Sequence, residues 1–150
     1  MSERRIRLAI KRVGAVEVPL PKYQTAGAVG LDLHAALTEP ITIAPTGRVL
    51  VPTGIALSIP EGYEGQVRPR SGLANRHGIG IVNSPGTIDP DYRGELAVVL
   101  INLGQELFVV EPLARIAQLV ICPVIHAELE LVEELGGSAR GSGGYGSTGV

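Results

Sequence analysis

Hydrophobic and polar positions alternate at the start of the chain and then give way to short apolar runs. Ile6, Leu8 and Ile10 alternate with charged residues, which is the period-two pattern of a half-buried strand. Every position of 96–101 is apolar, which predicts a strand buried on both faces. The other expected strands are the apolar runs 41–43, 49–51, 55–59, 79–82, 107–110, 119–125 and 129–132.

Turn-forming residues separate these runs. Proline and glycine recur together at 45–47, 52–54, 60–62 and 84–86. The 20 glycines and 11 prolines are too many for a helical bundle, because both residues weaken helix interiors. Only 71–77 has a helical pattern, and it is long enough for one or two turns. The sequence therefore predicts an all-β sandwich or barrel of short strands.

The composition describes the interior of this fold. The 150 residues fit one domain, which can bury a core without disulfides or a structural metal. Apolar residues make up 45% of the chain, but aromatic residues only 3%, and tryptophan is absent. We therefore expect a core of Val, Ile, Leu and Ala.

The last segment has a different composition. Residues 136–150 are mostly glycine with serine, so we expect a domain over 1–135 and a flexible arm over 136–150. The arm contains the spacing G-x-G-x-x-G, but only four residues follow it, so the helix of a dinucleotide-binding loop cannot form. Two interpretations stay open: a disordered, solvating tail, or a flap that closes over an anionic ligand carrying a flat base.

Charge and cysteine content exclude several classes of function. A net charge of -2 gives no broad footprint for nucleic acid or membrane, so we expect neither partner. No run approaches the roughly 18 apolar residues of a membrane span, and no signal-peptide pattern follows Met1. Cys122 is the only cysteine, so no disulfide can form within the chain. These features predict a cytoplasmic protein.

Residues 68–74 form the first group of chemical interest. Ser71 is a good N-cap for the short helical turn, and the backbone at Gly72 can approach a ligand closely. Free N–H groups at a helix start, with Arg70 alongside, suit a phosphate. An ordinary capped turn with solvated arginines explains the same stretch equally well.

The second group lies between the runs 79–82 and 96–101. Pro85-Gly86 fits the centre of a type II turn and Pro90-Asp91 that of a type I turn, so we expect a compact hairpin. Asp89 precedes a proline, which restricts its backbone and hence the direction of its carboxylate, as a general base requires. In isolation, however, Asp89 and Asp91 are more simply explained as turn formers.

Two further polar residues stand in apolar surroundings. Asp32 lies inside an expected strand and either faces solvent or holds a water of a magnesium ion. Gln118 lies just inside a buried strand, where an internal hydrogen bond is its simplest use. The three histidines show no metal-ligand spacing.

The order of these groups resembles that of a known family. Residues 28–33, 69–74 and 86–94 are similar to the first three motifs of the trimeric dUTP pyrophosphatase (dUTPase) family. Residues 115–119 resemble the fourth motif and 140–149 the fifth, so the resemblance covers nearly the whole chain. It implies a jelly-roll-like β-sandwich or barrel that forms a homotrimer, with active sites shared between subunits.

The implied reaction is the hydrolysis of dUTP to dUMP and pyrophosphate, which limits uracil incorporation into DNA and supplies dUMP for thymidylate synthesis. By this resemblance, Asp89 orients and activates the water that attacks the α-phosphate. Tyr92 packs against the deoxyribose and rejects a ribose 2′-OH. Asn83, with the backbone through Thr87 and Ile88, contacts the uracil edge.

The resemblance also assigns the phosphate-binding residues. It implies that Arg70, Ser71, Gly72 and Gln118 hold phosphates and that Asp32 contacts Mg²⁺ through water.

The arm is implied to close from a third subunit. Tyr145, where the family more often has Phe, would lie over the uracil next to Gly146, and Arg140, Ser147 and Thr148 would lie near the phosphates.

Two alternatives remain at this stage. A dCTP deaminase-like enzyme shares the fold, but its family lacks the Gly-rich arm and the Asp-Tyr hairpin pattern of this chain. A non-catalytic trimer that binds nucleotide is the alternative from another class, although Asp89, Arg70 and Arg140 all being present argues against it.

Overall fold

The structure, a computed structural model, describes residues 5–144 and consists of ten strands and one short helix. The strands are β1 (Ala9–Arg12), β2 (Leu31–His34), β3 (Ile41–Ile43), β4 (Arg48–Ser58), β5 (Tyr63–Arg68), β6 (Ile79–Ile81), β7 (Gly86–Ile88), β8 (Glu95–Asn102), β9 (Phe108–Val110) and β10 (Arg115–Pro123). The helix α1 spans Ser71–His77. Within the described residues, no helix is long and apolar enough to cross a membrane.

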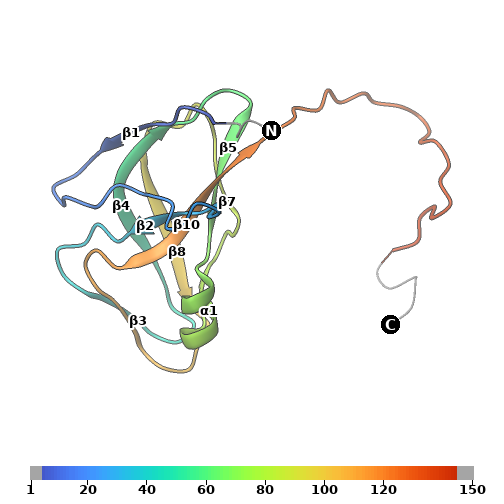
Figure 1. Ribbon diagram of the computed structural model, residues 1–150. Coiled ribbons are helices and arrows are strands. Elements are labelled where there is room, and N and C mark those ends of the chain that lie inside the picture. The colour runs from blue at the N-terminus through green and yellow to red at the C-terminus, as the bar shows by residue number, and fades with distance from the viewer. Residues whose placement is uncertain (1–4, 145–150) are drawn as a thin grey trace.

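Two antiparallel four-stranded sheets form the body of the molecule (Figure 1). One has the strand order β1-β4-β8-β6 and the other β2-β10-β5-β7, while β3 and β9 pair separately. This arrangement confirms the predicted all-β, sandwich-like, jelly-roll-related class, although the sheets do not close into a barrel.

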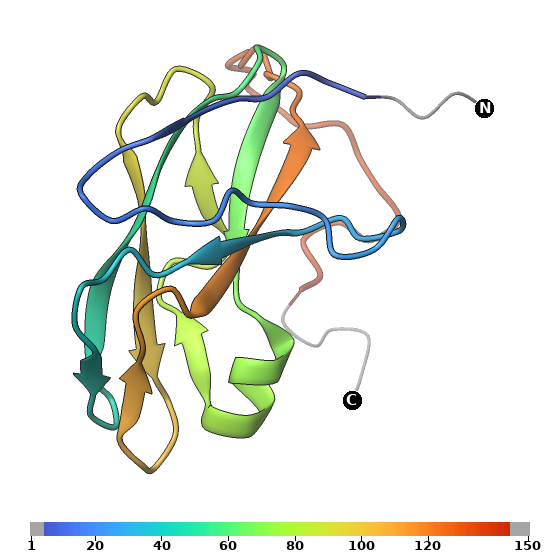
Figure 2. The same ribbon diagram turned by 60° about the vertical axis from the view of Figure 1, so that its left-hand side comes forward.

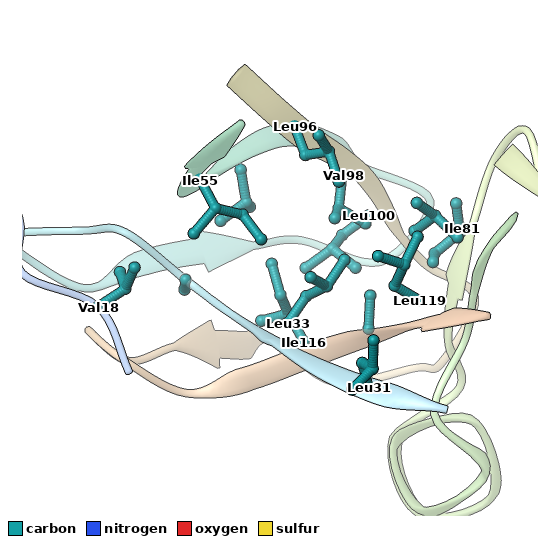
Figure 3. Packing of buried hydrophobic residues seen from close by; sticks show 14 of the residues in the cluster. Val18, Leu31, Leu33, Ile55, Ile81, Leu96, Val98, Leu100, Ile116 and Leu119 are labelled. Atoms are coloured by element: carbon teal, nitrogen blue, oxygen red, sulfur yellow. The ribbon is translucent and has the colours of Figure 1, made fainter. Parts of the chain in front are cut away.

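The core lies between these sheets, and its buried hydrophobic residues are all aliphatic (Figure 3). Leu96, Val98 and Leu100 point inward from β8, and Leu33 and Leu119 meet them from the opposite sheet. Each of these five side chains is fully buried, so the aliphatic core expected from the composition is present.

Most of the predicted strands exist, but β8 differs from the prediction in its burial. Its residues alternate between buried and half-buried, so only one face of the strand packs in the core. The other face carries Val99 and Ile101, which remain partly accessible within one chain. The prediction of a strand buried on both faces is therefore wrong for the isolated chain.

The first expected strand begins later than predicted. β1 starts at Ala9, and all four of its residues are exposed, including Ile10 at 38%. Its only partner is β4, so it lies at an edge of its sheet, and the half-buried pattern expected from Ile6, Leu8 and Ile10 is lost at Ile10. Edge strands often keep one accessible face.

The segment after β10 leaves the body of the molecule (Figure 1). The apolar run 129–132 forms no strand here, and Leu129 and Leu131 are 93% and 100% exposed. A single chain offers this segment no neighbouring strand, so the predicted strand at 129–132 is wrong for the isolated chain. The predicted boundary between a domain over 1–135 and an arm over 136–150 stays a prediction.

Candidate active site

The predicted site residues fall into two groups in the structure. We call Asp32, Arg70, Ser71, Gly72 and Gln118 the arginine group, which gathers where β2, β10 and the start of α1 meet. The hairpin group lies on β7 and on the turns at its two ends, and contains Asn83, Thr87, Ile88, Asp89 and Tyr92.

Asp32 is the centre of the arginine group. Its Oδ1 lies 3.3 Å from Nε of Arg70, and its Oδ2 lies 3.2 Å from Nη1 of Arg115. The Asp32 side chain is only 13% exposed, so the two ion pairs are partly shielded from solvent. The carboxylate is therefore not simply solvated, as one interpretation of the sequence allowed.

Gln118 is fixed by two neighbours. Its Nε2 donates a hydrogen bond of 2.9 Å to the carbonyl oxygen of Pro69. Its Oε1 lies so close to Gly30 that a Cβ there would come within 2.3 Å, so only glycine leaves room for the amide. Gln118 thus makes the internal hydrogen bond expected of a half-buried amide, and the second N–H of its Nε2 remains for a ligand.

Helix α1 differs from the prediction at its start. Arg70, not Ser71, is the N-cap, with extended backbone and no side-chain capping bond, and Ser71 is the first helical residue. The Ser71 hydroxyl is therefore exposed rather than used in capping. A Cβ on Gly72 would lie 3.1 Å from Nη2 of Arg76, whose Nε also donates to the Gly72 carbonyl, so Arg76 adds a cation that the sequence did not single out.

The turn after β7 holds Asp89. The N–H of Tyr92 donates to the Asp89 carbonyl at 3.2 Å, which confirms the predicted turn around Pro90-Asp91. The predicted type II turn around Pro85-Gly86 is wrong, because Gly86 lacks the positive φ that such a turn needs and already belongs to β7. The Asp89 side chain is exposed on this short, proline-restricted turn.

Tyr92 is fixed over the backbone beside it. Its Oη donates to the carbonyl oxygen of Glu95 at 3.0 Å. A Cβ at Gly94 would lie 2.4 Å from Oη of Tyr92, so the tyrosine ring fits here only because Gly94 has no side chain. The ring is 45% exposed and can present its remaining surface to a ligand.

The two groups do not meet within one chain. Asp32 lies opposite Gln118, Gln118 opposite Arg68, and Ile88 opposite Gly65. The path from β2 to β7 crosses three strand spacings of about 4.8 Å, and the two positions are offset by roughly four residues of about 3.3 Å along the strands. The backbones of Asp32 and Asp89 are therefore about 20 Å apart. Figure 2 agrees, with the yellow loop after β7 at the top and α1 at the bottom.

This separation has a chemical consequence. A carboxylate that acts through one water reaches only about 5–6 Å beyond its own oxygen. Asp32 and Asp89 of the same chain are thus too far apart to share one water molecule or one metal ion. A hollow of about 960 Å³ lined by Tyr23, Tyr63 and Ile121 includes no residue of either group.

The arm contributes little to either group here. Arg140 is exposed, and its Nε donates to the carbonyl oxygen of Gly143, well after the end of β10 at Pro123. The remaining predicted arm residues, Tyr145, Gly146, Ser147 and Thr148, lie outside the described residues.

His34 and Arg115 are neighbours that the sequence did not mark as site residues. Burial lowers the pKa of His34 below its ordinary 6.5; Asp32 raises this pKa, while Arg115 and Arg70 lower it further. Its Nδ1 is buried and has no partner among the described residues. Because both guanidinium groups flank Asp32, the imidazole faces a net positive surrounding that favours its neutral form.

Comparisons with known proteins decide what these groups belong to. The family model described as dUTPase matches residues 16–149. The chain is 62% identical to the deoxyuridine 5'-triphosphate nucleotidohydrolase of Anaeromyxobacter sp. (strain Fw109-5), over 96% of this chain and 98% of that protein. The chain belongs to the dUTPase family.

Two further likenesses agree with this assignment. The deoxyuridine 5'-triphosphate nucleotidohydrolase of Chlamydia pneumoniae is 59% identical, over 87% of this chain and 91% of that protein. A mutant dUTPase of Staphylococcus bacteriophage 80alpha with dUpNHpp superposes with a TM-score of 0.86 at 28% identity, over 96% and 99% of the two chains. The family, the enzyme class and the fold class expected from the sequence are thereby confirmed.

The described part of this chain is suited to a Mg²⁺ ion that is held mainly by water and substrate phosphates rather than by a cage of protein ligands. No cluster of three or more His, Cys, Asp or Glu side chains occurs within residues 5–144, so this part of the chain has no dedicated cage. Mg²⁺ typically keeps several waters and takes one or two carboxylates together with substrate phosphates. Asp32, already engaged by two arginines, fits a contact to such an ion through water.

Proposed function

We propose that this dUTPase-family chain hydrolyses dUTP to dUMP and pyrophosphate, with Asp89 activating the attacking water and Mg²⁺ bound to the triphosphate. The observation that carries the proposal is the Asp89–Tyr92 turn. It combines an exposed, direction-restricted carboxylate with a fixed aromatic ring on one short segment. A water-activating base and a surface for the sugar are thus only three residues apart.

The chemical step follows from the carboxylate. Asp89 accepts a proton from a water molecule whose oxygen attacks the α-phosphorus. The bond between that phosphorus and the α,β-bridging oxygen breaks, and its electron pair leaves with pyrophosphate. Pyrophosphate is a stable leaving group, so the chain's task is to position the water and to stabilise the transition state.

Base and sugar are recognised by the hairpin group. Thr87 and Ile88 pair with β5, and Asn83 lies in the turn just before β7. We propose that these three residues contact the uracil edge. A thymine methyl is worth only about 1–3 kcal/mol in an apolar pocket, so a stiff backbone that clashes with it discriminates better. The Tyr92 ring, held by Glu95 and Gly94, lies against the deoxyribose and leaves no space for a 2′-OH.

The phosphates belong to the arginine group in this proposal. Arg70, Ser71 and Gly72 supply a guanidinium, a free hydroxyl and backbone N–H groups, and Gln118 supplies its remaining N–H. When bound, Mg²⁺ neutralises phosphate charge and polarises phosphoryl oxygens. Asp32 would hold the ion through water.

A homotrimer completes the site. The two groups lie about 20 Å apart in one chain by strand geometry, so a hairpin from one copy must meet the arginine group of another. The outward face of β4, β6 and β8 supports self-association, because it is apolar and accessible. Leu50 on β4 is 62% exposed, and Val82 and Leu103, which directly follow β6 and β8, are 52% and 69% exposed. The unpaired apolar run 129–132 supports it as well, since a second copy can supply the missing strand.

The arm is proposed to close this shared site. Tyr145 would stack on the uracil beside Gly146, while Arg140, Ser147 and Thr148 would contact the phosphates. Closure would exclude water other than the attacking one.

We place the enzyme in the cytoplasm, with dUTP and its own copies as partners and neither nucleic acid nor membrane among them. Its net charge of -2 supports the last part. Its action would limit uracil incorporation into DNA and supply dUMP for thymidylate synthesis.

A product assay tests the proposal. Purified protein is incubated with dUTP or dCTP and Mg²⁺; pyrophosphate from dUTP alone is expected, whereas ammonia from dCTP, or binding without product, would contradict it. Asp89→Asn should lower turnover at least about 1,000-fold while sparing dUTP binding. Asp91→Asn, in the same turn, is the matched control and should stay close to wild type. Equal losses in both variants would show that Asp89 is only a turn former.

A further inference from the structure

A β-bulge in β10 determines which side chains face the arginine group. Ala117 lies opposite Leu33, but Arg115 lies opposite His34, so β10 advances two residues while β2 advances one. Ile116 is the extra residue. In a regular strand Arg115 and Gln118, three positions apart, would point to opposite faces of the sheet.

The bulge removes this alternation. Ile116 and Ala117 are consecutive and both buried, at 2% and 0% exposure. Arg115 and Gln118 therefore both emerge on the outer face, where Asp32 lies. The local irregularity brings a second guanidinium to a carboxylate that a regular strand would have kept from it.

Arg115 contacts both members of the Asp32–Arg70 pair. Its Nη1 donates to Oδ2 of Asp32 at 3.2 Å, while its carbonyl oxygen accepts from Nη1 of Arg70 at 3.3 Å. Arg70 is thus held at Nε by Asp32 and at Nη1 by the Arg115 backbone. Within residues 5–144 its Nη2 makes no further bond and is available for an anion.

The charges of this cluster favour an anion as well. Two guanidinium groups and one carboxylate leave one net positive charge, and Arg115 offsets the charge of Asp32 that would otherwise repel a triphosphate. Arg115 is 48% exposed and Asp32 only 13%, so the arginine covers the carboxylate from the solvent side.

We propose that Arg115 is a positioning residue of the nucleotide site: by fixing Asp32 it aims the guanidinium of Arg70 at a substrate phosphate. The inference rests on the proposed function and deepens it. Arg115 acts through Arg70, so its contribution should depend on Arg70 being present.

A double-mutant cycle tests this dependence. The dissociation constant of the dUTP analogue dUpNHpp is measured by calorimetry for wild type, Arg115→Met, Arg70→Met and the double variant. Loss of one charge-assisted contact weakens binding about tenfold, so Arg115→Met should bind about tenfold and Arg70→Met about 100-fold more weakly. The double variant should be no more than about twofold weaker than Arg70→Met alone.

Controls separate positioning from general charge and from misfolding. Arg7→Met removes an exposed arginine elsewhere and should bind as wild type. Arg115→Lys keeps a positive charge beside Asp32 and should recover part of the lost affinity. If circular dichroism shows that Arg115→Met does not fold, Arg115→Lys replaces it in the cycle.

Two outcomes overturn the inference. If wild type binds dUpNHpp but the two losses multiply to about 1,000-fold in the double variant, Arg115 acts as an independent charge and the positioning role is wrong. If wild type fails to bind dUpNHpp at all, the proposed function is wrong, and this inference falls with it.

Discussion

Two glycines decide how functional side chains lie in this protein. At Gly30 and Gly94 a Cβ would come within 2.3 Å and 2.4 Å of Gln118 and Tyr92, respectively. Neither glycine has the positive φ that would explain it as a turn residue. Because both glycines lack a side chain, the Gln118 amide and the Tyr92 ring can lie directly on the backbone.

Gly94→Ala should therefore damage sugar recognition. The added methyl displaces the Tyr92 ring, and misplacement of a positioning group by about 1 Å lowers kcat/KM for dUTP roughly 10- to 100-fold. The ratio of kcat/KM for dUTP to that for UTP should fall as well. Gly27→Ala, where nothing lies within 4 Å of the new Cβ, is the control and should leave both values unchanged. An unchanged dUTP-to-UTP ratio in Gly94→Ala would separate Tyr92 from sugar selection.

His34 gives the fold a defined response to acid. Burial lowers the pKa of His34 in the folded chain. At pH values between 6.5 and this folded pKa, the unfolded chain therefore binds more protons than the folded chain. The stability that depends on neutral His34 is intact above 6.5 and is lost as the pH falls toward the folded pKa. Urea unfolding from about pH 7.5 to about pH 5 should show this loss.

His34→Gln should flatten that pH dependence, because the glutamine does not titrate. The exposed His126→Gln is the matched control and should keep the wild-type slope. If His34→Gln and wild type lose stability in parallel, other groups cause the acid response.

Residue-level predictions from sequence succeeded where one neighbour decides the geometry. Pro90 alone restricts Asp89, and the turn it predicts is present. Arg115 could not be found in this way, because its direction depends on the bulge at Ile116. That bulge arises from packing two consecutive apolar residues into the core, which strand periodicity does not anticipate.

At the scale of elements, most strands that pair within the chain were predictable, but β5 and β7 were not, because neither forms a continuous apolar run. The apolar run 129–132 has the pattern of a strand, yet it is exposed because no strand of the same chain lies beside it. The start of α1 differs from the expectation: Arg70, which is paired with Asp32, is the N-cap, so the helix begins one residue earlier than a Ser71 cap requires.

Removal of the arm tests whether it acts as a flap over the proposed active site. A chain ending at Gly136 lacks Arg140 and the aromatic ring at Tyr145, so turnover of dUTP should fall at least about 100-fold. Because every strand within residues 5–144 ends by Pro123, thermal unfolding should stay close to that of the full chain. Near-normal turnover by the truncated protein would favour the solvating tail over the flap.

At the scale of the molecule, the two groups of residues that we propose form one site lie far apart in a single chain. The sheet register that separates Asp32 from Asp89 is fixed by the pairing of β2, β10, β5 and β7, so no side-chain motion brings them together. The apolar outward face of the β4-β8-β6 part of the sheet is the surface on which we propose that copies associate. The strand pattern of the sequence predicts the core, but it does not predict the separation of Asp32 from Asp89, because that separation depends on the order of the strands in the sheet.

Subunit mixing measures this division directly. Asp89→Asn inactivates the hairpin half and Arg70→Met the arginine half, so each variant alone should be nearly inactive. Refolded together from denaturant in equal amounts, random assembly pairs an intact hairpin with an intact arginine group in about a quarter of the sites, and about a quarter of wild-type turnover should return. A mixture that associates by light scattering but regains no turnover would contradict the account, because it would place both halves of each site in the same chain.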